Sequence, residues 1–574
     1  MSSMYGRSLS LLVLGSLLGG GSLDGATLPD HPWCGTSRSG LAAHAAIHED
    51  HQRRREGERG KAVRTFPEAA RAGDVAVLVD DGSMVVQPNP LDLSDFGVQY
   101  VPQRRGGLVA APSGDPVAEE VGQRIDLGDD DSREVAFPRG FRFPFFGRVH
   151  TRMFVHSDGN LTFVAPDAGS SERSLDRLIG GPPRIAPLFA DLNPEAAAGN
   201  GGVYVLASPA RVVVTWLDLP EFGQLNRNTF QAVLYPNGRI TFAFGELSAR
   251  EAVVGVAPGG GGQVQLLDYR ANLPTGVIRA GIAERFARTR SFDHLAVARA
   301  FFREFADIYD HLIVFLDFPQ SLGGGFAFEL TVKNDIRGIG LGLFDHAALV
   351  GSRGRLRSFV QMGTLARYPD DPHAEFLGTN STLDVLGQEA GHRWLSFLHF
   401  VDENGAVSDA LLGRDLAHWS FCHNSLASDM EGNEYQEDGG DRFTTIAATD
   451  RFSPLDQYAM GLIPAAQVPP FYYVDGCSVE RSASPEIGVT VQGRRVDVTI
   501  GQIVAAEGPR VPDSRRAPRS FNMAFILVAE GGQFPSAESI TKVDRFRAAW
   551  ESYFVQATDG RGSVSTVLRL KPRR

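Results

Sequence analysis

The chain is poor in cysteine and lysine, and it has no apolar run long enough to span a membrane. Three Cys in 574 residues are too few for a disulfide-dense scaffold, so hydrophobic cores must stabilise the fold. Only four of the 56 basic residues are Lys, and the formal net charge is -12. The scattered arginines therefore indicate a GC-rich, bacterial genome and do not indicate a nucleic-acid-binding protein.

Residues 1–26 have the layout of a secretory signal peptide. Arg7 supplies a positive charge, an apolar run extends from Leu9 to Leu18, and small residues follow. This run is shorter than the roughly 20 residues of a membrane-spanning helix. We therefore expect an exported protein without a membrane span, either secreted to the extracellular space or periplasmic.

The composition predicts a multidomain globular protein rich in β structure. Hydrophobic residues make up 43% and charged residues 22%, as in ordinary globular proteins. The 64 Gly and 33 Pro favour turn-rich β structure over helical bundles. We expect residues 27–105 to be a polar N-terminal segment with short strands and a candidate pro-region, ahead of two larger domains.

The middle of the chain predicts a β-sandwich. Short apolar runs alternate with turn signals, and Asn237-Gly238 between two alternating runs predicts a tight hairpin. The strings FPFFG, FVHSDGNLTF, PPRIAPLFADLNP, VVVTWLDLPEFG and TFQAVLYPNGRITFAFG follow one another in this region. Together they resemble the nidogen-type (NIDO) extracellular domain, which we place at residues 106–275.

That resemblance implies an extracellular β-rich module with a role in adhesion to cells or matrix. The expected partner is an extracellular protein, surface or matrix ligand, and nucleic acid is not expected. Binding residues do not come with the resemblance. The acidic run 128–132 offers oxygen ligands for calcium, but a charged surface turn is the simpler interpretation.

The last 300 residues carry the candidate chemistry, and we expect an α+β domain over residues 276–574. The segment 381–399 predicts a helix that places Gln388, His392 and His399 along one face. Glu389 lies beside that face, three residues before His392. Zinc hydrolases use the pattern H-E-x-x-H, in which two imidazoles bind the metal and the carboxylate acts as general base. This chain has Q-E-A-G-H, so Gln388 replaces the first histidine.

The replacement weakens the expected metal site, because a neutral amide oxygen is a poor ligand for zinc. His399 is two turns beyond His392, about 10 Å along the helix axis, and the two cannot share one ion. Downstream, His418 is a candidate ligand. Met460 lies in a predicted tight turn. The alternative for Glu389 and His392 is a helix pair that holds no metal.

The order of these features over residues 285–480 resembles secreted zincin-like metallopeptidases. The resemblance implies that Glu389 is the general base, that His392 binds zinc, and that Met460 forms a Met-turn under the site. Cys422 and Cys477, 55 positions apart, are a candidate disulfide, with Cys34 left over. Serine- and cysteine-hydrolase patterns are absent from the sequence.

Two functions remain open at this stage. In the first, the protein is a secreted binding or adhesion protein whose second domain is a degenerate zincin and a pseudo-enzyme. In the second, it is an active secreted zinc metallopeptidase with a non-standard set of ligands. The two hypotheses differ at position 388.

Overall fold

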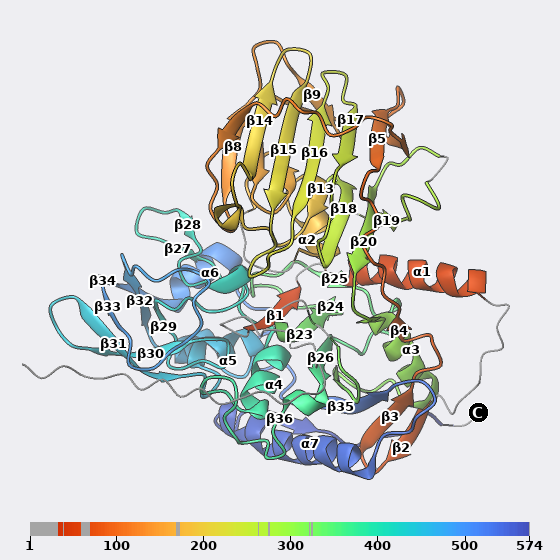
Figure 1. Ribbon diagram of the computed structural model, residues 1–574. Helices are drawn as coiled ribbons and strands as arrows, with labels where there is room; N and C mark the ends of the chain where they lie inside the picture. The colour runs from red at the N-terminus through yellow and green to blue at the C-terminus, as the bar shows by residue number, and fades with distance from the viewer. Residues whose placement is uncertain are drawn as a thin grey trace, which may run out of the picture.

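Two bodies of β structure make up the chain, a β-sandwich and a mixed-sheet domain that lies below it in Figure 1. The computed structural model describes residues 33–37, 40–58, 69–167, 173–261, 263–273, 276–320, 322 and 325–572. The signal peptide expected at 1–26 lies outside these residues. No helix in the described part of the chain is long and apolar enough to cross a bilayer.

The sandwich consists of two seven-stranded sheets. The first contains, in spatial order, β19 (Val264–Leu266), β20 (Gly281–Ala287), β18 (Glu251–Ala257), β13 (Arg184–Phe189), β12 (Asn160–Thr162), β11 (Arg152–His156) and β8 (Ser132–Ala136). The second contains β6 (Leu108–Pro112), β5 (Gly97–Pro102), β17 (Ile240–Phe244), β16 (Asn228–Leu234), β15 (Val212–Leu219), β14 (Gly202–Ala207) and β7 (Gln123–Ile125). A short ribbon of β9 (Phe143–Phe145) and β10 (Arg148–His150) joins β8 to β11.

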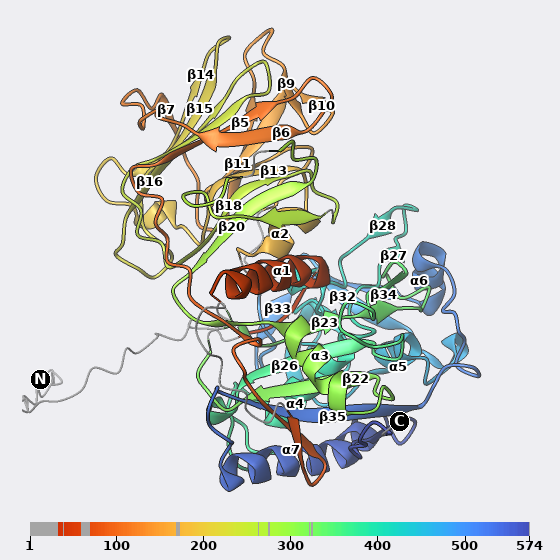
Figure 2. The same cartoon turned by 90° about the vertical axis from the view of Figure 1, so that its right-hand side faces the viewer.

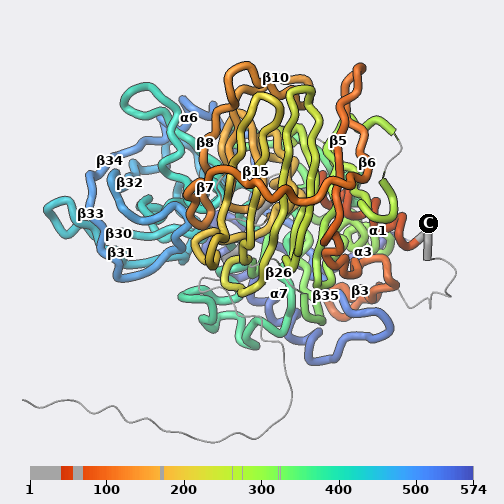
Figure 3. The backbone as a smooth tube through the Cα atoms, turned by 45° about the horizontal axis from the view of Figure 1, so that its top comes forward, coloured from red at the N-terminus to blue at the C-terminus, as the bar shows by residue number. Residues whose placement is uncertain are grey.

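Apolar side chains from the two sheets fill the space between them, as expected for a sandwich. Trp216 and Phe230 are fully buried there and stack with ring centroids 5.1 Å apart. The predicted hairpin is present, because β16 and β17 pair around Asn237-Gly238, where Gly238 has φ of 84°. Figure 3 views the molecule from the side of the sandwich. The orange and yellow strands of the sandwich lie in front of the green and blue chain of the other domain.

An eight-stranded mixed sheet forms the centre of the second domain. Its order is β1 (Trp33–Ser37), β23 (Gly325–Thr331), β26 (Ser358–Thr364), β22 (His311–Leu316), β35 (Ser520–Ala529), β3 (Val75–Val79) and β2 (Ala69–Ala72), with β36 (Ser563–Ser565) beside β35. Strand β22 is parallel to β26 and β35, whereas β23 is antiparallel to β26.

Helices cover both faces of this sheet. Ile313 and Phe315 face a core that includes residues of α4 (Thr382–Gly391) and α7 (Ala537–Ala557). Leu312 and Val314 face the opposite core, which includes α3 (His294–Glu304). Because β22 buries both of its faces, it has the continuous apolar sequence of a central strand.

A smaller six-stranded sheet extends this domain on one side. It contains β33 (Thr490–Gln492), β31 (Arg442–Ala448), β30 (Asn433–Glu437), β29 (His423–Asn424), β32 (Phe471–Asp475) and β34 (Arg494–Val498). The remaining elements are α2 (Leu175–Gly180), α5 (Pro454–Met460), α6 (Ile500–Glu507), four 3-10 turns and the paired short strands β4 (Val85–Val86) with β21 (Ser291–Phe292), β24 (Lys333–Asn334) with β25 (Phe344–Asp345), and β27 (Phe400–Val401) with β28 (Val407–Ser408).

The expected boundaries of the N-terminal segment are corrected by these pairings. Residues 27–105 do not stand apart, because β3 pairs with β35 in the centre of the second domain and β5 pairs with β17 in the sandwich. The sandwich also extends beyond 106–275, from β5 to the end of β20. Pairing between β3 and β35 joins strands more than 400 residues apart, which local sequence patterns do not reveal.

Helix α1 (Gly40–Glu58) lies between the two domains (Figure 2). It contacts α2 and β19 of the sandwich and α3 and β23 of the other domain. Nδ1 of His48 and of His51 lie 2.7 and 3.3 Å from Oδ2 of Asp293, the residue that caps α3. Burial opposes ionisation of Asp293, but the hydrogen bonds from the two histidines lower the pKa of its carboxyl to about 2. This carboxylate thus anchors α1.

Replacement of Asp293 by Asn is expected to loosen α1 without removing the cap of α3, since Asn also caps helices well. Loss of the buried charge-assisted hydrogen bonds is expected to lower the free energy of local opening of α1 by about 1.5–3 kcal/mol. The hydrogen-exchange rates of the α1 amides should therefore rise at least tenfold. Asp345→Asn, at an exposed carboxylate, is the matched control. Unchanged exchange in Asp293→Asn would show that α1 is held by other contacts.

Candidate functional site

The Q-E-A-G-H segment lies on α4, and its beginning is well specified by the sequence. Ser381 caps the helix by accepting hydrogen bonds from the amides of Leu383 and Asp384, and the Asp384 side chain bonds back to the amide of Ser381. This reciprocal arrangement is a capping box. The side chains that the motif predicted to be functional are all buried, namely Gln388, Glu389 and His392. Those of Glu389 and His392 are 0% exposed.

The predicted helix through His399 is wrong, because α4 ends at Gly391. Gly disfavours helix continuation, and Nδ1 of His392 lies 3.0 Å from the carbonyl oxygen of Leu395, three residues on, which stabilises the turn out of the helix. His399 instead lies next to α6, with its Nδ1 2.8 Å from Oε1 of Glu507. The shared face of Gln388, His392 and His399 therefore does not exist.

A buried ionic cluster lies beside the end of α4. Arg414 forms an ion pair with Glu431, and both side chains are less than a tenth exposed. Nη2 of Arg414 also lies 3.1 Å from Nε2 of His418. Gln388 on α4 donates from Nε2 to Oε1 of Glu431 at 3.3 Å. The guanidinium is thus the cation that both the carboxylate and the imidazole of this cluster contact.

The two imidazoles of the cluster are held in the same tautomer. A carbonyl oxygen only accepts, so Nδ1 of His392 donates to Leu395, and Nδ1 of His418 donates to the carbonyl of Arg414 at 2.9 Å. Each Nε2 therefore carries a lone pair, and that of His392 is buried without a hydrogen-bond partner in the described structure. The rings meet edge to face with centroids 4.8 Å apart. Burial is the main reason that the pKa of His392 lies well below its usual value, and electrostatic repulsion from His418 lowers it further.

Backbone strain accompanies this cluster. Five of the thirteen described non-glycine residues with positive φ lie between 415 and 431, namely Asp415, Leu416, Leu426, Ala427 and Glu431. L-residues seldom adopt this conformation, and each instance costs on the order of 1–3 kcal/mol. The loops that carry Arg414, His418 and Glu431 are therefore held in place by the surrounding fold.

These residues do not fit a zinc ion. The amide nitrogen of Gln388 points to Glu431, and the Arg414 guanidinium takes the lone pair of His418 that a metal would need. Among the described residues, no group of three His, Cys, Asp or Glu side chains in this domain has ligand atoms close enough to share an ion. The structure brings His392, His418 and Gln388 together, but His418 contacts a guanidinium and Gln388 contacts the carboxylate paired with it.

The Met-turn interpretation of Met460 is also corrected. Residues Pro454–Met460 form helix α5, which begins with a capping box of Ser453 and Asp456 and is followed by Gly461 at φ of 84°. This is a regular helix with a glycine after its last residue, signals that the sequence carried. Met460 is buried in the main core of the domain.

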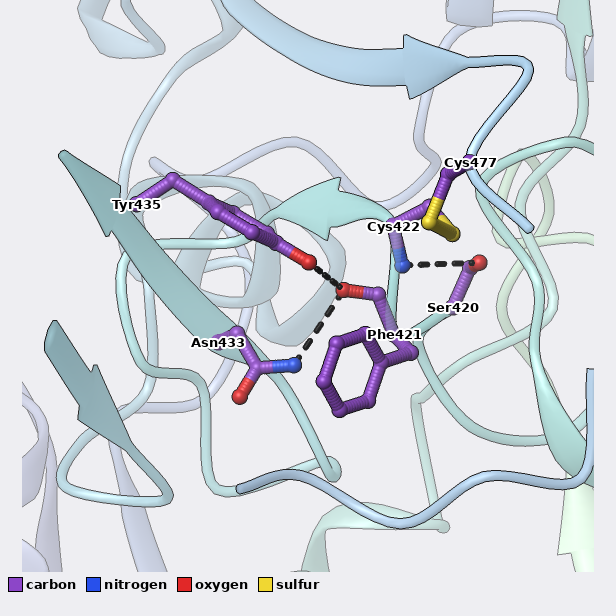
Figure 4. The surroundings of a disulfide bond; sticks show 6 residues. All are labelled: Ser420, Phe421, Cys422, Asn433, Tyr435 and Cys477. Atoms are coloured by element: carbon purple, nitrogen blue, oxygen red, sulfur yellow. Dashed lines mark hydrogen bonds between the residues drawn. A yellow bond between two sulfur atoms is a disulfide. The ribbon is translucent and has the colours of Figure 1, made fainter. Parts of the chain in front are cut away.

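Cys422 and Cys477, the candidate pair, are joined by a disulfide with Cα atoms 6.1 Å apart. Figure 4 shows its surroundings, where the carbonyl of Phe421 accepts hydrogen bonds from Tyr435 and Asn433. The bond connects the loop after His418 to the segment that follows β32. It therefore fixes one side of the ionic cluster relative to the small sheet.

Replacement of both Cys422 and Cys477 by Ser is expected to destabilise the domain. Opening a loop of this length costs about 4 kcal/mol in the chain-entropy model, because the unfolded state gains freedom. Chemical denaturation followed by near-ultraviolet circular dichroism measures the loss. Urea midpoints that agree within error for the oxidised wild type and the double variant would contradict the prediction.

A second arginine lies among carboxylates in the sandwich. Within the described residues, only one group of three His, Cys, Asp or Glu side chains has ligand atoms close enough to share a metal ion, and it consists of Asp130, Asp158 and Asp191. Arg173 forms ion pairs with all three, at 2.9 Å to Asp158 and to Asp191. Burial raises the pKa of Asp130 to about 6 even though Arg173 opposes the shift. The acidic run 128–132, for which a charged surface turn was the simpler interpretation, thus contributes Asp130 to an arginine-centred cluster.

The sandwich also has a relative among known families. Residues 115–291 match the model of a family described as NIDO related. The matched stretch includes every strand of the two sandwich sheets except β5 and β6, and we refer to the sandwich below as the NIDO-related module. No curated protein and no solved structure matches the chain.

Sequence reasoning missed five residues of these clusters: Arg414, Glu431, Arg173, Asp158 and Asp191. Glu431 lies in an acidic loop that was visible in the sequence, but its partner on α4 is 43 positions away. Nothing local distinguishes Arg414 or Arg173 from the other arginines. Their roles depend on loops that only tertiary packing brings together.

Proposed function

We propose that this is a secreted, extracellular binding protein of the adhesion type. The NIDO-related module holds a surface or matrix partner, and the second domain is a zincin-like pseudo-enzyme. The observation that carries the proposal is the guanidinium of Arg414, which pairs with Glu431 and takes the lone pair of His418 that a metal ion would need. Strand β23, which lies between β1 and β26 and is antiparallel to β26, contacts α4, and this mixed sheet beside the helix supports the likeness to zincins.

Zinc analysis tests the pseudo-enzyme part of the proposal. Elemental mass spectrometry of the wild type is expected to find far less than one zinc per chain, with no change in His392→Ala. The double variant Gln388→His/Arg414→Ala restores the imidazole and removes the internal cation, and is expected to gain zinc. A double variant that folds and stays free of zinc would contradict a zincin origin.

One observation favours the alternative, an active zinc metallopeptidase. The Nδ1 atoms of His392 and His418 are fixed by carbonyls and leave each Nε2 as an acceptor, which is the orientation typical of metal-binding histidines. Stoichiometric zinc in the wild type, together with casein hydrolysis lost in Glu389→Gln, would establish this alternative and exclude the pseudo-enzyme.

Retention of protein-coated beads under flow tests the adhesion part. Beads that carry the full chain are expected to remain on a surface coated with laminin- and collagen-containing matrix extract, while albumin-coated beads wash off. Equal loss of both kinds of bead would overturn the adhesion proposal.

A further inference from the structure

One end of the NIDO-related module carries a group of hairpin turns on the side away from the second domain (Figures 1 and 2). Strands β14 to β17 form a meander, so the turns 208–211 and 235–239 lie at the same end. The pairing of β5 with β17 places the turn 103–107 there as well. A Cβ atom on Gly238 would lie 2.8 Å from the carbonyl oxygen of Pro144, so the β9–β10 ribbon belongs to this end too.

These turns contain arginine and no acidic residue. We call them the arginine face, which comprises the segments 103–107, 137–142, 146–148, 208–211 and 235–239. Its arginines are Arg104, Arg105, Arg139, Arg142, Arg148, Arg211 and Arg239, and the first five are exposed. None forms an ion pair within the described residues, whereas Arg152, just outside the face, pairs with Glu134.

The opposite end of the module carries both signs of charge, with Arg173 and Arg227 paired to its carboxylates. It contains the Asp130, Asp158 and Asp191 cluster together with Asp218 and Glu221. Acidic side chains predominate in the chain as a whole, with a net charge of -12. A face with seven arginines and no carboxylate is therefore a local concentration of positive charge, which attracts polyanions and raises their association rate.

The turns are rigid enough to present these arginines in fixed positions. The turn 103–107 is closed by backbone hydrogen bonds in both directions between Gln103 and the glycines that follow it. The guanidinium of Arg239 lies 3.8 Å from the ring centroid of Tyr235, a cation–π contact that limits its motion. Ordered side chains lose less entropy when they bind a ligand.

We propose that the arginine face binds a polyanionic glycan, one that carries sulfate or carboxylate groups along its chain. Guanidinium groups bind such oxyanions with two parallel hydrogen bonds. Single-stranded nucleic acid would in addition need open aromatic faces for base stacking. Here Phe141 is buried, Tyr235 is covered by Arg239, and no aromatic side chain of the face is exposed. This inference rests on the proposed adhesion function and names its partner class.

Binding of fluorescently labelled heparin to the full-length protein tests the inference. The variant Arg104→Ser/Arg105→Ser/Arg142→Ser changes exposed turn residues and is expected to weaken binding at least tenfold. The dependence of log K on log salt concentration is expected to become shallower by about one for each lost contact. The control Arg481→Ser/Arg494→Ser/Arg495→Ser changes net charge equally at arginines already paired with acids, and is expected to bind as the wild type does.

Three outcomes would overturn the inference: no heparin binding by the wild type, equal binding by both triple variants, or equally tight binding of a 20-nucleotide single-stranded DNA. The bead experiment separates this inference from the proposed function. Beads that adhere although heparin does not bind would refute the glycan partner alone. Heparin binding without bead retention would refute adhesion alone.

Discussion

Arg414→Ala is expected to destabilise the second domain by about 3–5 kcal/mol. The variant leaves the Glu431 carboxylate buried without its cation, and an uncompensated buried charge costs this much. It also removes the hydrogen bond to Nε2 of His418. Urea denaturation at neutral pH, followed by circular dichroism, measures the change.

Two further variants separate the charge effect from simple truncation. Arg481→Ala removes an exposed ion pair with Asp409 and is expected to cost less than about 1 kcal/mol. Arg414→Met/Glu431→Gln removes both charges and is expected to recover part of the loss, since no unpaired carboxylate remains. A double variant as unstable as Arg414→Ala would show that packing, and not charge, makes Arg414 important.

Glu329→Gln is expected to make the protein more stable at alkaline pH and to have little effect near pH 4.5. Glu329 lies on β23, is fully buried, and accepts a hydrogen bond from Thr331 at 2.9 Å. Burial raises the pKa of its carboxyl from 4.5 to about 8. A group whose pKa is raised on folding stabilises the native state below its unfolded pKa, and this stabilisation is lost as the pH rises towards 8.

The size of the effect follows from the same shift. Each pH unit between the two pKa values removes about 1.4 kcal/mol, so the wild type loses about 4 kcal/mol from this group by pH 8. Glutamine does not titrate and does not lose this amount. Unfolding free energies of both proteins from pH 5 to pH 8 measure the difference, with the exposed Glu246→Gln as control. Parallel pH profiles for wild type and Glu329→Gln would contradict the prediction.

Local patterns were enough to predict elements whose neighbours lie close in sequence. The Asn237-Gly238 turn specifies the β16–β17 hairpin through the positive φ that it requires. Val543, Phe546 and Trp550, spaced near the helical period of 3.6 residues, are buried on one face of α7. In each of these cases a single local feature decides the structure. It is the geometry of the turn in the hairpin and the burial of one apolar helix face in α7.

Long-range contacts could not be predicted in the same way. Strand β3 has the composition of any buried strand, and only tertiary packing selects β35 as its neighbour. The helix expected to reach His399 ends early because a side-chain hydrogen bond from His392 competes with the helical pattern. In the candidate site, the sequence identified the two imidazoles but not Arg414, which contacts His418 and Glu431. An ion pair between two loops leaves no periodic signal in the sequence.

The two internal arginines determine how the protein responds to a shortage of metal ions. Arg173 and Arg414 supply the positive charge at clusters where other proteins bind calcium or zinc, and a guanidinium stays charged throughout the physiological pH range. Proteins that fold around a metal lose their structure in chelators. This chain carries its cations covalently, so Arg173 and Arg414 stay with their carboxylates when free divalent ions are scarce.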